Sequence, residues 1–146
     1  MIRVRVPATS ANLGAGFDCY GLALGLFNEI EVTLAEETTL IIEGEGIDEL
    51  PRDQENLVLR ALAWYFDAIG QTMPPVRIYT RNGIPVARGL GGSSAAIVSG
   101  LLAGNALAGD LLSATDLLDM AVAIEGHPDN VAPAILGGII VGVMDG

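Results

Sequence analysis

The chain has 146 residues, about the length of one domain, and half of them are hydrophobic, which is enough to build a core. Charged residues make up only 17%, which argues against disorder. Eighteen acids against seven bases give a formal charge of −11, which excludes a nucleic-acid binder that works by neutralising phosphates. All seven bases are arginine, so a bound polyphosphate would depend mainly on backbone N–H groups.

Single cysteine and histidine residues narrow the class of site further. They exclude a disulfide framework, a cysteine-based zinc site and a histidine-rich metal site, and they indicate a reducing, cytoplasmic setting. The N-terminus alternates apolar and basic residues and is not a signal peptide. Gly89–Gly109 carries no charge, but six of its 21 residues are glycine, so it predicts a buried helix and no membrane span.

The strand candidates are rich in β-branched residues and alternate apolar with polar side chains. They cover 2–6 ending at Pro7, 22–34 as one long or two short strands, 39–43, 76–80 and 138–144. The segments 8–18, 44–52 and 82–92 are expected to be loops. The last strand runs almost to residue 146, which suggests that the natural chain continues.

The helix candidates have apolar residues three and four positions apart, with capping signals at their ends. They cover 53–69 ending at Gly70, 93–107, a helix from the capping box at Ser113 to near Gly126, and a turn or short helix between Pro128 and Pro133. Strands dominate the first third and helices the rest, which predicts an α+β fold.

The segment that carries chemistry is Ile84–Ala96, between a strand and a helix. It lacks the lysine of a Walker A loop and the spacing of a dinucleotide fingerprint. Its glycines would let the backbone approach an anion, and the helix N-terminus would favour phosphate there. Ser93 and Ser94 could reach a phosphate or Mg²⁺. The simpler alternative is a helix start preceded by a flexible turn.

The Pro-containing Gly-Leu-Gly-Gly-Ser-Ser-Ala-Ala loop resembles the phosphate loop of the GHMP kinases. Two further segments, Pro7–Asp18 with Gly21–Leu24 and Glu125–Ala134 with Gly137-Gly138, narrow the resemblance to the homoserine kinases within that family. The three segments span essentially the whole chain. The resemblance implies two layers, a mostly antiparallel sheet with helices on one face, as in some ribosomal proteins.

This sequence departs from the family in two ways. The relatives are about twice as long, and their C-terminal half supplies a third glycine-rich motif and substrate-binding arginines, so residues 1–146 are expected to be the N-terminal, ATP-binding domain only. The loop also has one glycine more than the usual Gly-Leu-Gly-Ser-Ser. Without a gap, Gly92 and Ser93 take the two serine positions; with one inserted glycine, Ser93 and Ser94 do.

The resemblance implies a set of residues for Mg-ATP. The ATP-binding set is Asn56, Pro85, Arg88, Gly89, Leu90, Gly91, Gly92, Ser93, Ser94 and Ala95. Ser93, Ser94 and Glu125 would hold Mg²⁺, with Asp119 as the alternative acid. Simpler roles stay open: Asn56 as a polar group in a first helical turn, Arg88 as a solvated loop residue, and Glu125 as a surface acid.

The resemblance also implies substrate contacts. Asn12 would hold the hydroxyl of the substrate, Asp18 would pair with its ammonium group, and Asp129 and His127 would contact it from a second loop. Some relatives carry an aspartate base where this chain has Asn130. Asn12 and Asn130 would therefore catalyse by positioning, without a strong base. Ordinary turn formation is the alternative for Asn12 and Asp18.

The expected reaction is Mg-ATP-dependent phosphorylation of L-homoserine to O-phospho-L-homoserine in threonine biosynthesis. The expected partners are L-homoserine and ATP, with no nucleic acid or membrane and with a possible homodimer. A mevalonate-type kinase is the alternative within the family, although mevalonate has no amine for Asp18. A nucleotide-binding unit without turnover and a structural domain are alternatives of other kinds.

Overall fold

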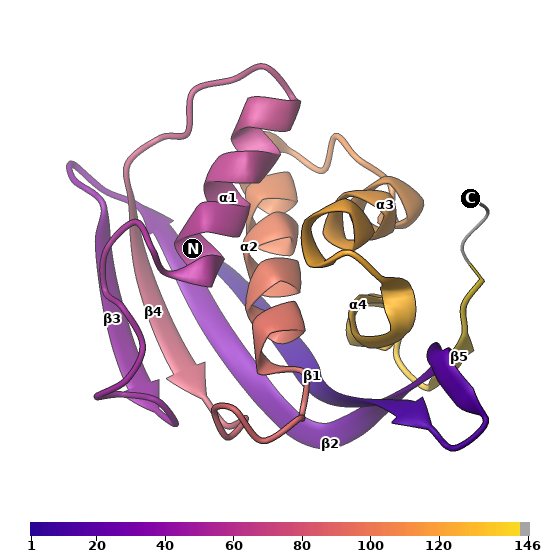
Figure 1. Ribbon diagram of the computed structural model, residues 1–146. Coiled ribbons are helices and arrows are strands. Elements are labelled where there is room, and N and C mark those ends of the chain that lie inside the picture. The colour runs from indigo at the N-terminus through magenta and orange to yellow at the C-terminus, as the bar shows by residue number, and fades with distance from the viewer. Residues whose placement is uncertain (144–146) are drawn as a thin grey trace.

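The computed structural model describes residues 1–143, apart from the side chain of Asp18. Its elements in chain order are β1 (Ile2–Leu13), β2 (Gly16–Leu34), β3 (Thr39–Gly44), α1 (Leu57–Ala68), β4 (Val76–Asn82), α2 (Gly92–Ala108), α3 (Ala114–Glu125), α4 (Pro128–Leu136) and β5 (Ile139–Val141). The strands form one sheet in the order β1-β2-β4-β3, with β5 paired to β2. All four helices cover the same face of this sheet (Figure 1).

The predicted fold class is confirmed. The sheet is mostly antiparallel, and the exception is the parallel pairing of β3 with β4. The long strand β2 spans 22–34 as a single element and extends back to Gly16. Its two ends have different neighbours on the same side, because β5 pairs with residues 20–22 and β4 with residues 28–34.

Two predictions for the first 18 residues are wrong. The first strand does not end at Pro7, and 8–18 is not a loop but a hairpin in which β1 and β2 continue. β1 is an edge strand, where a proline that lacks an N–H group does not break a ladder on both sides. The register shifts between Pro7 and Thr9, so the strand accommodates the proline at an irregularity.

The helices lie where they were expected, except that α1 begins at Leu57, four residues later than the predicted start at 53. α3 begins with the predicted capping box, in which Ser113 and Asp116 satisfy each other's backbone N–H groups. The segment between Pro128 and Pro133 forms a helix, with Pro133 inside it. β5 is shorter than the predicted strand 138–144, whose residue 144 lies outside the described residues.

Helix α2 lies at the centre of the helical layer, beside α1 (Figure 1). Its glycines allow this approach, because a Cβ at Gly100 would lie 2.4 Å from the carbonyl oxygen of Val58, and one at Gly104 would lie 2.7 Å from the Tyr65 ring. The uncharged segment is therefore a buried helix, as predicted. Within the described part of the chain, no helix has the length and apolar character to cross a membrane.

Candidate functional site

A cavity of about 550 Å³ opens where the glycine-rich loop meets the starts of α1 and α2. Its walls also include residues of the β1–β2 hairpin, β2, β4 and the end of α3. The predicted site residues that line it are Asn12, Asn56, Pro85, Arg88, Gly89, Leu90, Gly91, Gly92, Ser93, Ser94, Glu125 and Asn130. The fold thus brings together residues more than one hundred positions apart in the sequence.

The loop before α2 has an unusual backbone. Its φ angle is positive at Ala87, Gly89 and Gly91, which are alternate residues. Alternation between left-handed and ordinary conformations points successive N–H groups into one concavity, an arrangement that binds anions. The N-terminus of α2 follows directly, and it has no side-chain cap among the described residues. No side chain of the described residues therefore caps these N–H groups, and they are available to an anion.

Two strands fix the position of this loop. The Oδ1 atom of Asn28, on β2, accepts hydrogen bonds from the backbone N–H groups of Gly83 (3.0 Å) and Ile84 (3.1 Å). The N–H group of Thr9, on β1, donates to the carbonyl oxygen of Leu90 at 3.0 Å. Both Asn28 and Thr9 are buried. The loop is therefore held at its start and near its end.

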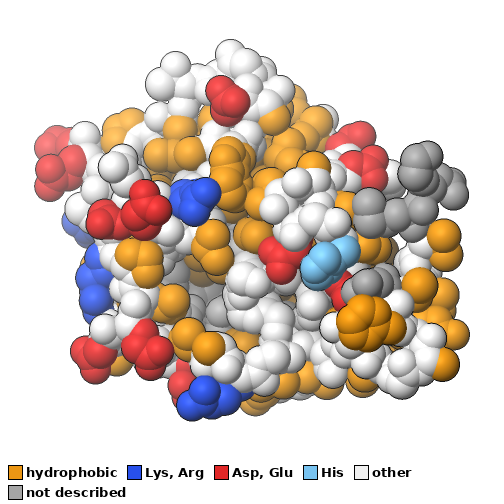
Figure 2. Space-filling view, viewed as in Figure 1, with side chains coloured by type: hydrophobic (Ala, Val, Ile, Leu, Met, Phe, Trp, Pro, Cys, Tyr) orange, Lys and Arg blue, Asp and Glu red, His pale blue; other side chains and the backbone are white. Residues whose placement is uncertain are grey.

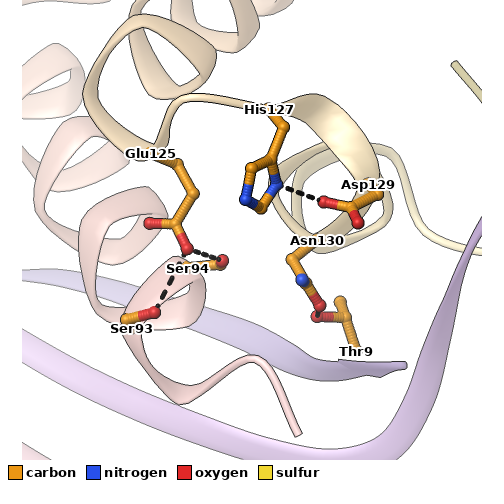
Figure 3. Close-up of polar contacts among 7 residues, drawn as sticks. All are labelled: Thr9, Ser93, Ser94, Glu125, His127, Asp129 and Asn130. Atoms are coloured by element: carbon orange, nitrogen blue, oxygen red, sulfur yellow. Dashed lines mark hydrogen bonds and ion pairs between the residues drawn. The ribbon is translucent and has the colours of Figure 1, made fainter. Parts of the chain in front are cut away.

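Ser93, Ser94 and Glu125 meet at the first turn of α2 (Figure 3). Both serine hydroxyls donate to the same oxygen, Oε1 of Glu125, at 3.2 Å from Ser93 and 2.9 Å from Ser94. At the end of α3 a carboxylate is unfavourable against the helix dipole, but the start of α2 beside it favours negative charge. Both hydroxyls reach the carboxylate, so the extra glycine does not separate either serine from it.

These three residues offer only oxygen ligands, which suit Mg²⁺. The described residues contain no cluster of three or more His, Cys, Asp or Glu side chains that could hold a metal ion. A single carboxylate with hydroxyls fits the way Mg²⁺ is usually held, by one or two carboxylates together with the phosphates of a substrate. The donor set therefore fits a nucleotide-borne Mg²⁺ and does not resemble an all-protein metal cage.

A second polar group lies at the start of α4 (Figure 3). The Nδ1 atom of His127 is 2.5 Å from Oδ1 of Asp129. The Asp129 side chain is fully buried, whereas that of His127 is 48% exposed. The other carboxylate oxygen, Oδ2, is buried without a hydrogen-bond partner among the described residues. Such an oxygen is costly to leave unpaired, so a hydrogen-bond donor at Oδ2 would stabilise the carboxylate.

Asn130 follows Asp129 on α4 and lines the cavity. His127, Asp129 and Asn130 are called the α4 group below. The Oδ1 atom of Asn130 accepts a hydrogen bond of 2.8 Å from the hydroxyl of Thr9. The sequence analysis missed Thr9 as a site residue, although Thr9 lies in the first of the segments that carry the resemblance. Asn130 lies 121 residues further along the chain, and nothing in the local sequence around Thr9 indicates this contact.

The remaining predicted residues have different surroundings. Asn12 has a left-handed backbone (φ 57°) near the tip of the β1–β2 hairpin. Asn56 is the N-cap of α1, and its Oδ1 accepts from the N–H group of Val58 at 3.0 Å. Ala95 is fully buried and does not line the cavity. The side chain of Asp18 lies outside the described residues; its backbone is part of β2.

Charge around the cavity is sparse. Arg88 is the one basic residue among the described residues that line it, and Glu55 and Glu125 are the acids. The Arg88 guanidinium is exposed, and its Nη1 donates to the neighbouring carbonyl oxygen of Ala87 at 3.4 Å. Figure 2 shows the histidine on the surface of the helical side, with acidic side chains nearby. A phosphate placed here would depend on backbone groups more than on side-chain cations.

The family model described as "GHMP kinases N terminal domain" matches residues 56–138, more than half of the chain. This segment includes the glycine-rich loop, the Ser93–Ser94–Glu125 cluster and the α4 group. The chain belongs to the GHMP kinase family.

The similar relatives within that family are homoserine kinases. The chain is 49% identical over 143 residues to the homoserine kinase of Desulfitobacterium hafniense and 48% identical over 143 residues to that of Moorella thermoacetica. Each match covers 98% of this chain and 48% of the relative. The chain thus spans about half the length of the curated relatives it matches.

Comparison with solved structures also finds homoserine kinases. A putative homoserine kinase from Listeria monocytogenes superposes with a TM-score of 0.83 at 42% identity, over 98% of this chain and 50% of that one. The homoserine kinase from Cytophaga hutchinsonii gives 0.82 at 32% identity, over 96% and 47%. A mevalonate kinase from Methanococcus jannaschii, at 16% identity and a TM-score of 0.72 over 94% and 52%, shares the fold.

Proposed function

We propose that this chain is the N-terminal, nucleotide-binding domain of a homoserine kinase, which transfers the γ-phosphoryl group of ATP to the hydroxyl of L-homoserine. The observation that carries the proposal is the cluster of Ser93, Ser94 and Glu125 beside an uncapped helix start. It lies in a chain nearly half identical to named homoserine kinases. Because these relatives are about twice as long, the complete reaction is proposed for the enzyme at their full length, called the full-length enzyme below.

ATP would bind with its phosphates against the loop and the start of α2. Backbone N–H groups at residues 87–92 would donate to the phosphate oxygens, aided by the helix dipole. Ser93, Ser94 and Glu125 would hold Mg²⁺, which neutralises charge on the phosphates when it is bound. Apolar residues in the wall of the cavity, including Ile30, Val58 and Ile84, suit the nucleobase.

L-homoserine would bind beside the start of α4. By resemblance, Asp129 would contact its ammonium or hydroxyl group; in the structure the Asp129 side chain is buried, and the cavity lining does not include it. His127 holds the Oδ1 atom of that carboxylate, which orients it. By resemblance, Asp18 and Asn12 would contact the ammonium and the hydroxyl from the hairpin. An amine-free alcohol such as mevalonate would offer no ammonium group to Asp18.

Phosphoryl transfer would proceed by positioning and charge stabilisation. The transition state is loose, so little proton transfer is required of the protein while the bond to the leaving group breaks. Asn130 cannot accept a proton in the way a carboxylate does, but its amide can hold a reacting oxygen. Asn12 would act on the attacking hydroxyl in the same way.

Two measurements test this proposal. First, ATP with Mg²⁺, ATP without Mg²⁺ and tripolyphosphate are titrated against the 146-residue chain by calorimetry, with Ser93→Ala and Ser94→Ala variants. We expect binding that Mg²⁺ strengthens in the parent chain and a loss of that strengthening in the variants. No binding of either ATP or tripolyphosphate would overturn the proposal.

Second, homoserine and mevalonate are compared as acceptors in the full-length enzyme by a coupled ADP assay. Homoserine should be the preferred substrate. Preference for mevalonate would keep the nucleotide site and replace the proposed acceptor with that of the alternative kinase.

A further inference from the structure

Thr9 touches both halves of the candidate site. It is fully buried on β1, beside the register shift that follows Pro7. Its hydroxyl donates to Oδ1 of Asn130 on α4, and its backbone N–H donates to the carbonyl oxygen of Leu90 in the glycine-rich loop. It does not line the cavity, so it would act on a ligand only through these neighbours.

In the structure, the contact with Asn130 occupies the oxygen end of that amide. A carboxamide has one oxygen that accepts and one nitrogen that donates. The Thr9 hydroxyl holds the oxygen at 2.8 Å, so the nitrogen points away from Thr9 (Figure 3). Because Asn130 lines the cavity, this orientation presents a donor there. A flipped amide would present an acceptor, which repels the oxygens of a phosphoryl group.

The contact with the loop is equally close. A Cβ atom built on Gly91 would lie 2.0 Å from the Thr9 hydroxyl oxygen and 3.3 Å from Oδ1 of Asn130. Gly91 therefore packs directly over the Thr9–Asn130 hydrogen bond. The same threonine sets the distance between the phosphate loop and the amide.

We propose that Thr9 is a positioning residue that locks the Asn130 amide with its Nδ2 toward the transferred phosphoryl group and holds the loop in register with it. The proposal rests on the proposed kinase function for its chemical consequence. Its geometric part, the locked amide, applies to the 146-residue chain by itself.

The kinetic test uses the full-length enzyme with Thr9→Val, Thr9→Ser, Asn130→Ala and the double variant Thr9→Val/Asn130→Ala. Thr9→Val keeps the shape and removes the hydroxyl. We expect kcat to fall about 10- to 100-fold, with the KM for ATP changed less than threefold, and Thr9→Ser to restore most of kcat. Thr33→Val, a matched change on β2 outside the cavity, should leave kcat unchanged.

The double variant decides whether Thr9 acts through Asn130. If it does, Thr9→Val costs little more once Asn130 is alanine, so the two effects are strongly non-additive. Additive losses, or an equal rise in the KM for ATP with kcat intact, would overturn the proposal and leave Thr9 as a packing residue.

A spectroscopic test is independent of activity. The side-chain NH₂ resonances of asparagine in the ¹⁵N-labelled 146-residue chain are assigned by variants and compared between the parent, Thr9→Ser and Thr9→Val. We expect the Asn130 pair to shift and broaden in Thr9→Val only. An unchanged Asn130 signal overturns the locked amide, whereas a locked amide in an enzyme without homoserine kinase activity overturns only the proposed function.

Discussion

Helices α2 and α4 both start at the candidate site, and they differ in charge. Among the described residues neither has a side-chain cap, whereas α1 and α3 are capped by Asn56 and Ser113. The first turn of α2 carries no acid, and its donors are left open. The first turn of α4 carries the buried carboxylate of Asp129.

This difference shows how a helix N-terminus can suit either an anion or a cation, depending on whether its first turn carries a carboxylate. An open helix N-terminus favours an anion, so the α2 start suits a phosphate. At α4 the protein supplies the anion itself, so the oxygen of Asp129 that lacks a partner in the described structure suits a cation such as an ammonium group. The comparison supports the proposal that the nucleotide binds at α2 and the amino acid beside α4.

The largest expected effect separates nucleotide binding from turnover. The 146-residue chain alone should bind Mg-ATP but show no homoserine-dependent ADP release in a coupled assay. A substrate carboxylate is favourably held by a bidentate arginine, and Arg88 is the one arginine among the described residues that line the cavity. The others lie on strands, on α1 or just before it: Arg3, Arg5, Arg52, Arg60, Arg77 and Arg81.

The control for this prediction is the full-length enzyme under the same assay. Turnover by the 146-residue chain near the full-length rate would contradict the prediction. It would mean that residues of this chain already hold the substrate carboxylate.

Substitutions of two glycines in the loop before α2 should weaken nucleotide binding to different extents. Gly89 and Gly91 have nearly the same left-handed backbone (φ 70° and 69°), but a Cβ at Gly89 meets nothing within 4 Å, whereas one at Gly91 meets Thr9. Gly89→Ala should cost about 1 kcal/mol of unfolding free energy, from backbone strain alone. Gly91→Ala should cost roughly 1–3 kcal/mol more and abolish the stabilisation by Mg-ATP.

Denaturant unfolding with and without Mg-ATP measures both effects. Arg88→Ala serves as the comparison for charge and should weaken nucleotide binding without abolishing it. The opposite ranking, with Arg88→Ala the more damaging to binding, would show that a side-chain cation outweighs the backbone groups.

Neutralising a carboxylate beside α2 and one beside α4 should change different kinetic constants. In the full-length enzyme, Asp129→Asn should raise the KM for homoserine about 10- to 100-fold and leave the KM for ATP unchanged, because it removes a charge-assisted hydrogen bond. Asp18→Asn should act in the same direction. Glu125→Gln should instead raise the Mg²⁺ concentration needed for half-maximal rate. The assignment fails if Asp129→Asn and Glu125→Gln raise the same constant.

The sequence predicts the elements that depend on neighbouring residues better than those that depend on residues far apart in the chain. The helices and the capping box at Ser113 depend on residues within a few positions, and the sequence predicts them, apart from the start of α1 and the choice between a turn and a helix at α4. The hairpin within residues 8–18 was not predicted, because its Ser, Asn and Gly residues are typical of loops and the strand conformation depends on pairing with β2.

The candidate site divides in the same way. The loop and the serines could be predicted from a contiguous motif, and the resemblance supplied Glu125. The contact between Thr9 and Asn130 and the packing of Gly91 over it depend on the folded arrangement of β1, the loop and α4. The Asn28 contacts that fix the start of the loop are also tertiary, and no local signal marks them.

The smallest expected effects are on stability. They compare a serine hydroxyl that has no hydrogen-bond partner among the described residues with one that caps a helix. The hydroxyl of Ser99, on α2 and beside the cavity, is buried without a hydrogen-bond partner among the described residues. The hydroxyl of Ser113 caps α3 by accepting from the N–H group of Asp116. Ser99→Ala should therefore raise the unfolding free energy by about 1 kcal/mol, and Ser113→Ala should lower it by about 1 kcal/mol.

Acid should separate these two variants further. The hydroxyl and N–H group of Ser113 both donate to the Asp116 carboxylate and hold its pKa below the ordinary value. A lowered pKa in the folded state stabilises the protein above the unfolded-state pKa, and that contribution is lost as pH falls through the lowered value. The penalty of Ser113→Ala should shrink across that acid range, whereas the gain of Ser99→Ala should stay constant, in urea titrations at several pH values. A Ser99→Ala variant less stable than the parent would show that this hydroxyl has a partner in the folded protein and is not held open beside the cavity.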